Sequence, residues 1–365
     1  MVTTLYDAMR ASIEAFSDIQ PGCNGPWGVP DNGLRNTAHW LIAFAWGYRT
    51  LGEKRYKDKA WQLGQSLLSK EYRPCGYSFL HLPKHSYPEN GLIGQAWTIE
   101  ALITAAQTLE DSLYTDVAAK VFTLHRFCPQ RGLWHILRPD GQIAEVHSTL
   151  NQQVWFAAMG IQLAHMGYSI PKDDIECFMN KIDENIKIVN GGLLGMKIAG
   201  APYPAPNLAR RLLSKLRSGS RSTYFPFREV SVGYHAFTLY GFGLLKSLMP
   251  NHPFWQSDKL QRALKWGCSR RHQRALRRNR FAMGYNPSGI EMPYVLQVFF
   301  ADRMDYILSE SRWWIREQLR RHFNPETGLL SRNSPDPHTL AARIYEAIRL
   351  SEPLLNLSLN GERGR

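Results

Sequence analysis

The sequence lacks the short motifs that mark common metal and nucleotide sites. Its 365 residues contain no Cys-X-X-Cys pair, no His-Glu-X-X-His, no P-loop and no Gly-X-Gly-X-X-Gly. No apolar run reaches the roughly 20 residues of a membrane-spanning helix. We therefore expect a protein that holds neither a metal nor a cofactor and does not cross a membrane.

Cysteine is scarce, and its number is odd. The five cysteines are Cys23, Cys75, Cys128, Cys177 and Cys268. The first residues also lack the basic and apolar stretches of a secretory signal. Free thiols in a reducing cytoplasm fit this pattern best.

Positive charge is in excess, with 44 Lys and Arg against 31 Asp and Glu. Nine basic residues lie within Lys259–Arg280, and a second cluster comprises Arg210, Arg211, Lys215, Arg217 and Arg221. These clusters are either solvated helix faces or surfaces for an anionic partner. We expect an acidic glycan, or peripheral contact of Lys259–Arg280 with the anionic inner surface of a membrane. No nucleic-acid-binding motif accompanies the clusters, so we do not expect a nucleic-acid partner.

The strongest pattern is a degenerate repeat of apolar segments rich in glycine and alanine. Six such segments, each after a loop marked by Gly or Pro, span residues 34–46, 91–102, 149–160, 232–242, 290–300 and 338–347. A helix that is apolar on nearly every side is buried on nearly every side. The repeat therefore predicts six buried helices.

More charged, amphipathic segments follow these buried helices. They span residues 53–69, 113–126, 172–189, 253–280 and 305–322, and several precede a Gly-Leu or Gly-aromatic step typical of a short hairpin. The alternation predicts an all-α protein: a single-domain (α/α)6 toroid over residues 1–365, with short β-hairpins in its loops. An open α-solenoid is the alternative. The longest spacing between repeats predicts an inserted basic, Pro-rich loop or lid at about 197–228.

In a toroid, the buried helices run parallel and their N-termini surround one end of a central cavity. That end favours an anionic or oxygen-rich ligand. We therefore expect the site among polar and aromatic residues at the starts of the six helices. The proposed catalytic residues are Asp31, Glu89 and Glu291. The proposed substrate-binding residues are Trp27, Asn32, Asn36, His39, Trp40, Asn90, His147, Asn151, Tyr234, His235, Tyr294, His338 and Arg343.

Carboxylates around a cavity suit glycoside hydrolysis, which uses one protonated acid and one base or nucleophile. Asp31 and Glu89 are the first pair, with Glu291 second, and apolar neighbours of Glu89 favour a raised pKa and an acid role. Helix capping is the competing interpretation for the acids. Histidine and tyrosine would instead support a uronate lyase or a sugar epimerase. A third hypothesis is a non-catalytic, glycan-binding scaffold of a membrane-associated synthesis complex.

Three stretches carry a resemblance to a known group, namely Pro30–Gly33, Pro88–Ala96 and Gly233–His235. The chain resembles the six-hairpin glycosidase superfamily over roughly residues 20 to 350, and looks closest to members of unassigned activity from surface-polysaccharide and protein-glycosylation gene clusters. The resemblance implies a toroid and a carbohydrate substrate. Members of the superfamily include hydrolases, epimerases and lyases. Glu89 and His147 stand where unsaturated glucuronyl hydrolases have aspartates, and His235 and His338 match the epimerase histidines only in part.

Overall fold

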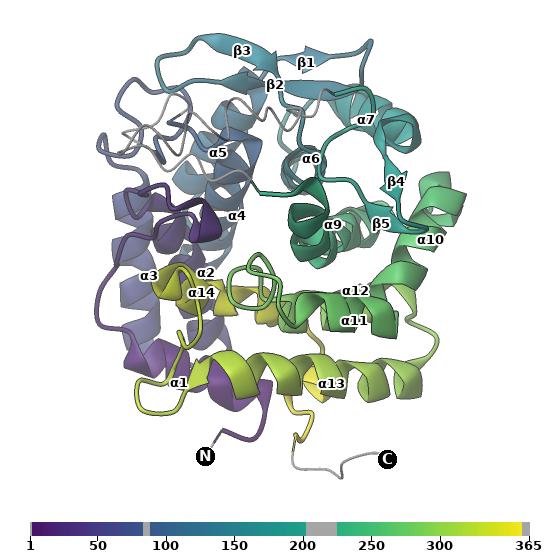
Figure 1. The fold of residues 1–365 in the computed structure, drawn as a ribbon. Coiled ribbons are helices and arrows are strands. Elements are labelled where there is room, and N and C mark those ends of the chain that lie inside the picture. The colour runs from purple at the N-terminus through teal and green to yellow at the C-terminus, as the bar shows by residue number, and fades with distance from the viewer. Residues whose placement is uncertain (1, 83–87, 202–224, 360–365) are drawn as a thin grey trace, which may run out of the picture.

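The computed structural model describes residues 2–82, 88–201 and 225–359, and its centre is a closed ring of helices (Figure 1). Each inner helix packs on the next one in chain order, and the last packs on the first. The ring comprises α2 (Leu34–Leu51), α4 (Gly91–Leu109), α6 (Leu150–His165), α9 (Phe227–Leu248), α12 (Ser288–Phe299) and the pair α14 (Pro337–Ala342) and η3 (Arg343–Arg349). This ring confirms the predicted (α/α)6 toroid.

The glycines of the inner helices explain how closely the ring packs. A β-carbon on Gly160 of α6 would lie 2.3 Å from the ring of Phe122, and one on Gly241 of α9 would lie 2.9 Å from Trp155. Such separations are below van der Waals contact, so larger residues would force the helices apart. The small-residue pattern of the sequence therefore reflects close approach of buried helices and their neighbours.

An outer layer of amphipathic helices surrounds the ring. It consists of α1 (Leu5–Ala15), α3 (Lys54–Leu67), α5 (Leu113–Leu124), α7 (Lys172–Asn185), α10 (Asp258–Gly267), α11 (Arg270–Leu276) and α13 (Met304–His322). On α13 the buried positions Ile307, Ser311, Trp314 and Gln318 recur at the three- and four-residue spacing of one helix face. Among the described helices, none combines the length and apolarity that crossing a bilayer requires.

Helix α1 is an element that the sequence pattern did not reveal. Thr4 caps it by accepting a hydrogen bond from the Asp7 backbone, and the Asp7 carboxylate accepts from the Thr4 backbone in return. The helix packs against α2, η3 and α13. It therefore occupies the outer position beside the last inner helix and closes the outer layer with a segment from the opposite end of the chain.

Short antiparallel hairpins join the layers where the Gly-marked steps predicted them. A three-stranded sheet contains β1 (Phe127–Cys128), β2 (Leu133–Leu137) and β3 (Ile143–Val146), and two-stranded ladders pair β4 (Ile188–Val189) with β5 (Leu193–Leu194) and β6 (Phe323–Asn324) with β7 (Leu329–Leu330). Gly132 and Gly328 turn two of these hairpins at φ values of +64° and +71°, a region that favours glycine.

The boundaries of the later units differ from those expected. Helix α9 begins at Phe227, five residues before the predicted 232, and the sixth inner element changes from α-helix to 3-10 helix at Arg343. Short helices η1 (Gly25–Trp27), η2 (Pro253–Gln256) and α15 (Glu352–Leu355) complete the described elements. Most of the predicted insertion at 197–228, with the second basic cluster, falls on residues 202–224 and lies outside the described residues.

Candidate functional site

A cavity of about 190 Å³ opens at the N-terminal end of the inner helices. The starts of α4, α6 and α9 and the segments that precede α2 and α12 contribute to it. Its lining residues are Asn24, Trp27, Asn90, Ile93, Trp97, Thr149, Asn151, Gln152, Met196, Tyr234, Phe237, Tyr285 and Asn286. Among the described residues that line the cavity, none carries a charged side chain, and most present a ring, an amide or a hydroxyl.

Aromatic rings line the cavity, and neighbouring rings and hydrogen bonds fix their orientation. The Trp27 indole packs at 5.2 Å centroid distance from both Phe225 and Phe281, and its Nε1 donates to the Tyr234 hydroxyl at 3.1 Å. The Tyr285 hydroxyl donates to the Asn24 side-chain oxygen at 2.8 Å. Rings fixed in this way present preorganised apolar faces.

The amide side chains of the cavity differ in how many of their hydrogen-bonding groups have a partner in the protein. The Asn286 amide nitrogen donates to the backbone oxygens of Gly233 and Phe281 at 3.0 and 2.8 Å, so this side chain is occupied by the fold. Gln152 accepts from the Ile93 backbone at 3.2 Å. The buried Oδ1 of Asn151 has no hydrogen-bond partner among the described residues. An unsatisfied buried acceptor is costly, so Asn151 is suited to a ligand donor.

His147 lies against the first residue of α4. A β-carbon on Gly91 would lie 2.8 Å from its Nε2 and 2.3 Å from Gln152 Oε1. Its Nδ1 accepts from the Thr149 backbone at 3.2 Å, so the neutral ring carries its proton on Nε2. Burial, with the nearby charge of Lys197, lowers the pKa of His147 to about 3. At neutral pH this residue is therefore an uncharged hydrogen-bond donor beside the cavity.

Glu89 precedes the cavity residue Asn90, which adopts the left-handed conformation before α4. Within the part of the chain that the structure describes, both carboxyl oxygens of Glu89 are buried without a hydrogen-bond partner. Burial raises the pKa of this carboxyl to about 7. Among the described residues, Glu89 is the one of the three predicted acids that forms no ion pair, although it borders the cavity lining and is not part of it.

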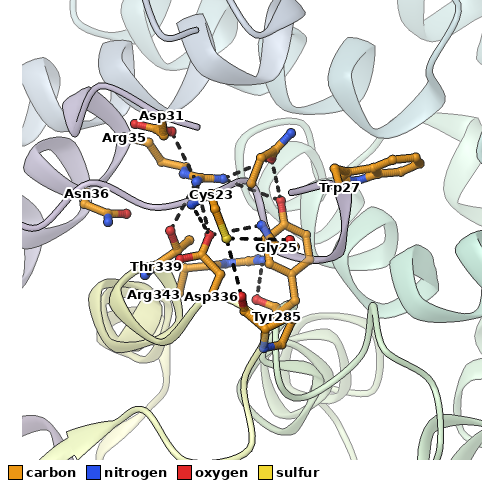
Figure 2. A network of polar contacts seen from close by, with 12 residues as sticks. Cys23, Gly25, Trp27, Asp31, Arg35, Asn36, Tyr285, Asp336, Thr339 and Arg343 are labelled. Atoms are coloured by element: carbon orange, nitrogen blue, oxygen red, sulfur yellow. Dashed lines mark hydrogen bonds and ion pairs between the residues drawn. The ribbon is translucent and has the colours of Figure 1, made fainter. Parts of the chain in front are cut away.

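Asp31 belongs to a buried network around Arg35 (Figure 2). Its Oδ1 accepts from the Gly33 backbone at 2.7 Å, and its Oδ2 lies 3.2 Å from the Arg35 guanidinium. Arg35 also lies 3.5 Å from Asp336 Oδ2 and donates to Thr339 at 3.1 Å. Burial raises the pKa of Asp31, and Arg35 opposes this rise. The network joins the N-terminal loop, α2 and α14 behind the cavity wall.

The third predicted acid, Glu291, is paired with Arg343. The Arg343 guanidinium lies 2.9 Å from Glu291 and 2.6 Å from Glu346, and its carbon lies 4.9 Å from the ring centroid of Phe237. Burial raises the pKa of Glu291, and that of Glu346 to about 7, while Arg343 opposes both shifts. Arg343 and Glu291 therefore lie behind the wall that Phe237 forms.

His39 lies deeper, behind Trp97. Its ring stacks on Tyr345 at 4.5 Å and meets the edge of Trp97 at 5.1 Å. Neither ring nitrogen has a hydrogen-bond partner in residues 2–82, 88–201 and 225–359. Burial and the nearby charges of Arg343 and Arg35 lower the pKa of His39 well below its usual value.

The remaining predicted binding residues separate into three groups. Trp27, Asn90, Asn151 and Tyr234 line the cavity. Asn32 donates to the backbone of Leu80, in the segment before α4, and Asn36 donates to the backbone of Gln20, in the segment before α2, so both hold loops in place.

The other four lie away from the cavity lining. Trp40 packs on Phe16, and the Tyr294 hydroxyl lies 3.2 Å from Ser247. His235 faces the outer layer, where it contacts the Leu194 backbone and Ala263 oxygen. His338 is exposed.

Comparison with known proteins identifies the family. No family model matches the chain. Archaeal glycosylation protein Q of Haloferax volcanii is 32% identical over 96% of this chain and 98% of its own length. The chain belongs to the family of archaeal glycosylation protein Q.

Solved structures share the fold of this glycosylation protein Q relative at low identity. D-mannose isomerase matches with a TM-score of 0.63 and 13% identity, covering 95% of this chain and 96% of its own. Cellobiose 2-epimerase from Spirochaeta thermophila gives 0.60 and 13%, over 94% and 93% of the two chains. A heparin-specific unsaturated glucuronyl hydrolase gives 0.58 and 10%, over 95% and 93%. These matches confirm the resemblance to the six-hairpin superfamily at the level of fold.

Several cavity residues of this glycosylation protein Q relative were not among the predicted site residues. Gln152, Tyr285 and Asn286 stand at the starts of inner helices, so the same positional rule covers them. Trp97 and Phe237 lie one helical turn beyond the lining residues Ile93 and Tyr234, on the same helix faces. The loop residues Asn24 and Met196 carry no helical periodicity that could have indicated them.

Proposed function

We propose that this member of the glycosylation protein Q family is a carbohydrate-active enzyme that acts on a sugar unit during glycan assembly. The observation that carries the proposal is the uncharged, ring-and-amide lining of the cavity. Aromatic faces stack on the C–H surface of a sugar, while amides and hydroxyls bind its hydroxyl groups. About 190 Å³ suits one sugar unit better than a long oligosaccharide.

The arrangement favours proton transfer on the sugar, as in epimerisation, isomerisation or elimination. Hydrolysis by a carboxylate pair requires two carboxyl groups that face the glycosidic bond. Asp31 and Glu291 are instead held by Arg35 and Arg343, and none of the three predicted acids is among the residues that line the cavity, although Glu89 directly precedes the lining residue Asn90. The Nε2 proton of His147 suits stabilisation of an oxygen that gains negative charge when a neighbouring carbon loses its proton.

Glu89 supports both this reaction and a second candidate. A pKa of about 7 suits a general base for proton abstraction, and it equally suits the protonated acid of a glycoside hydrolase. Hydrolysis therefore remains the second candidate, with Glu89 as acid and the predicted partner Asp31 as base.

For the partners and the location, we propose a glycan precursor at the cytoplasmic face of a membrane. Arg271, Arg274, Arg277 and Arg278 are exposed on and after α11 and could meet an anionic lipid surface. Other cations of Lys259–Arg280 are partly neutralised, since Arg262 pairs with Asp258 and Arg280 with Glu229.

The reaction can be tested in heavy water with a panel of reducing sugars and uronate-containing oligosaccharides. Deuterium entering the sugar carbon beside the carbonyl, seen by NMR, indicates proton transfer. Two sugar products without deuterium on carbon indicate hydrolysis, and a new near-ultraviolet absorbance indicates elimination.

Matched variants locate the activity in the cavity. Trp97→Ala and Asn151→Ala should reduce turnover at least tenfold, whereas Trp61→Ala, at an exposed position of α3, should not change it. Sugar binding without turnover of any substrate in the panel would instead favour the non-catalytic scaffold and overturn the enzyme proposal.

A further inference from the structure

A second cavity, of about 340 Å³, lies beside the segment 282–286, which also borders the first cavity. The first cavity, the proposed binding site of a sugar, is termed the sugar cavity. The end of α11, the loop after it, the end of α13 and the loop before α14 form its walls. Three arginines, Arg277, Arg280 and Arg321, line it. The uncharged first cavity and this basic second cavity therefore have opposite chemical character.

Two of the three guanidinium groups are held in place by the fold. Arg321 pairs with Glu317 through Nε and donates from Nη1 to the Arg277 backbone oxygen at 2.9 Å. Arg280 pairs through Nε with Glu229 at 2.7 Å. Each contact uses part of a five-donor fork and leaves further N–H groups for a ligand.

The third guanidinium, that of Arg277, is exposed and has neither a hydrogen bond nor an ion pair within the described part of the chain. The carboxylates that pair with the other two arginines are Glu229 and Glu317, and Glu317 also pairs with Arg320. Three guanidinium groups against two carboxylates leave a positive excess at the cavity, which Arg277 presents to solvent. This excess calls for an anionic ligand.

The other lining residues add polar and apolar character. His322 Nδ1 donates to the Arg332 backbone oxygen at 2.8 Å, which leaves Nε2 as an acceptor in the neutral ring. The floor contains the buried apolar residues Leu276, Ala282 and Met283. The cavity thus combines a cationic rim with an apolar base.

We propose that this second cavity is a binding site for the phosphate group of a phosphorylated ligand. Guanidinium groups that come from separate elements can engage several oxygens of a tetrahedral phosphate, whereas a planar carboxylate offers only two. This goes beyond the proposed reaction in the sugar cavity and does not depend on it.

The position of the site relates it to the sugar cavity. Residues 282–284 face the second cavity, while Tyr285 and Asn286 line the first. One short segment therefore forms a wall of both. A bound phosphate would therefore contact the same segment that carries two lining residues of the first cavity.

The first experiment is calorimetric titration of the full chain with inorganic phosphate and pyrophosphate. Arg277→Gln should weaken pyrophosphate binding at least tenfold. Arg262→Gln, which removes the same charge from an exposed position of α10, should weaken it less than twofold. Arg277→Lys should restore part of the affinity, because the charge returns without the planar fork. Melting temperatures show that each variant is folded.

The second experiment distinguishes a free phosphate from a lipid headgroup. Flotation with vesicles that contain phosphatidic acid, against vesicles of phosphatidylcholine alone, reports on a lipid-borne phosphate. Binding of pyrophosphate without vesicle binding indicates a soluble phosphorylated ligand, and vesicle binding lost in Arg277→Gln indicates a lipid phosphate. Equal effects of the Arg277 and Arg262 variants, or no binding of any probe, would overturn the site.

Discussion

The indole nitrogen of Trp27 donates a hydrogen bond of 3.1 Å to the hydroxyl of Tyr234 across the mouth of the sugar cavity. The two residues are 207 positions apart in the sequence. This bond ties the short η1 turn to α9, and it orients two rings that line the cavity. The shape of the cavity therefore depends in part on a hydrogen bond between distant parts of the chain.

Loss of this contact should weaken sugar binding more than it weakens the fold. Trp27→Phe and Tyr234→Phe each remove one partner while keeping a ring, and each should cost about 0.5–1.5 kcal/mol of unfolding free energy. The double variant should cost little more than either single one, because the interaction is shared. Chemical denaturation and sugar titration of all four proteins check this. Full additivity would contradict the contact.

Glu89→Gln should stabilise the protein in alkaline solution. The carboxyl pKa is 4.5 in the unfolded chain and about 7 in the fold, so the folded protein binds more protons between these values. Stability of the wild-type chain therefore falls as pH rises from 4.5 to 7. The glutamine variant does not lose stability in this way, so its free energy of unfolding at pH 8 should exceed that of the wild-type protein by on the order of 1–3 kcal/mol.

Melting temperatures at pH 4 and pH 8 test the Glu89 prediction. The difference between Glu89→Gln and the wild-type protein should be small at pH 4 and largest at pH 8. Glu71→Gln, at an exposed position, serves as the control and should show no such trend. The activity should fall in Glu89→Gln, which separates the acid–base role from the structural cost. A stabilised variant with full activity would remove Glu89 from the mechanism.

Arg343→Met should be strongly destabilising. It leaves the buried carboxyls of Glu291 and Glu346 without their shared cation, a change that costs about 3–5 kcal/mol. Both carboxyls then resist ionisation, so the loss should be greater at pH 8 than at pH 5. Adding Glu291→Gln to Arg343→Met should recover part of the stability. Thermal unfolding of the wild-type protein and of the two variants at both pH values measures these differences.

Gly91→Ala should damage the site through crowding. The positive φ of +64° costs alanine about 1–2 kcal/mol, and the new β-carbon would press on Gln152 and His147. Gly52→Ala is a matched control, since its φ is +73° but nothing lies within 4 Å of the added carbon. Both variants should lose similar backbone stability, while only Gly91→Ala should lose sugar affinity. Equal loss of affinity would assign the effect to helix strain alone.

The fold could be predicted because local sequence patterns indicate which helices are buried. Inner helices such as α4 are apolar on every side, and glycines such as Gly160 and Gly241 allow close packing, so burial is visible in the order of residues. Helix α1 was missed because its short amphipathic pattern of 11 residues does not distinguish it from other surface segments. Its place in the outer layer depends on contacts with the far end of the chain, which no local pattern shows.

The end of the ring that holds the cavity could be predicted from the sequence, but the charge states of the nearby acids could not. Helix starts predicted the cavity end, and Trp27, Asn90, Asn151 and Tyr234 indeed line it. The pairing of Asp31 with Arg35 is a local spacing of four residues, yet that of Glu291 with Arg343 spans 52 positions. Whether an acid is free or ion-paired depends on such distant partners. The pairing decides whether the carboxyl group can take part in proton transfer.

The two ends of the described chain meet on one side of the molecule, where the Leu359 backbone nitrogen donates to the Thr3 oxygen at 3.1 Å (Figure 1). The apolar face of α1 is therefore covered in part by elements from the far end of the chain, namely η3, α13 and α15. Removal of the last inner element would leave the flanks of α2 and α12 exposed. The ring is thus a closed unit whose stability depends on all of its sectors at once.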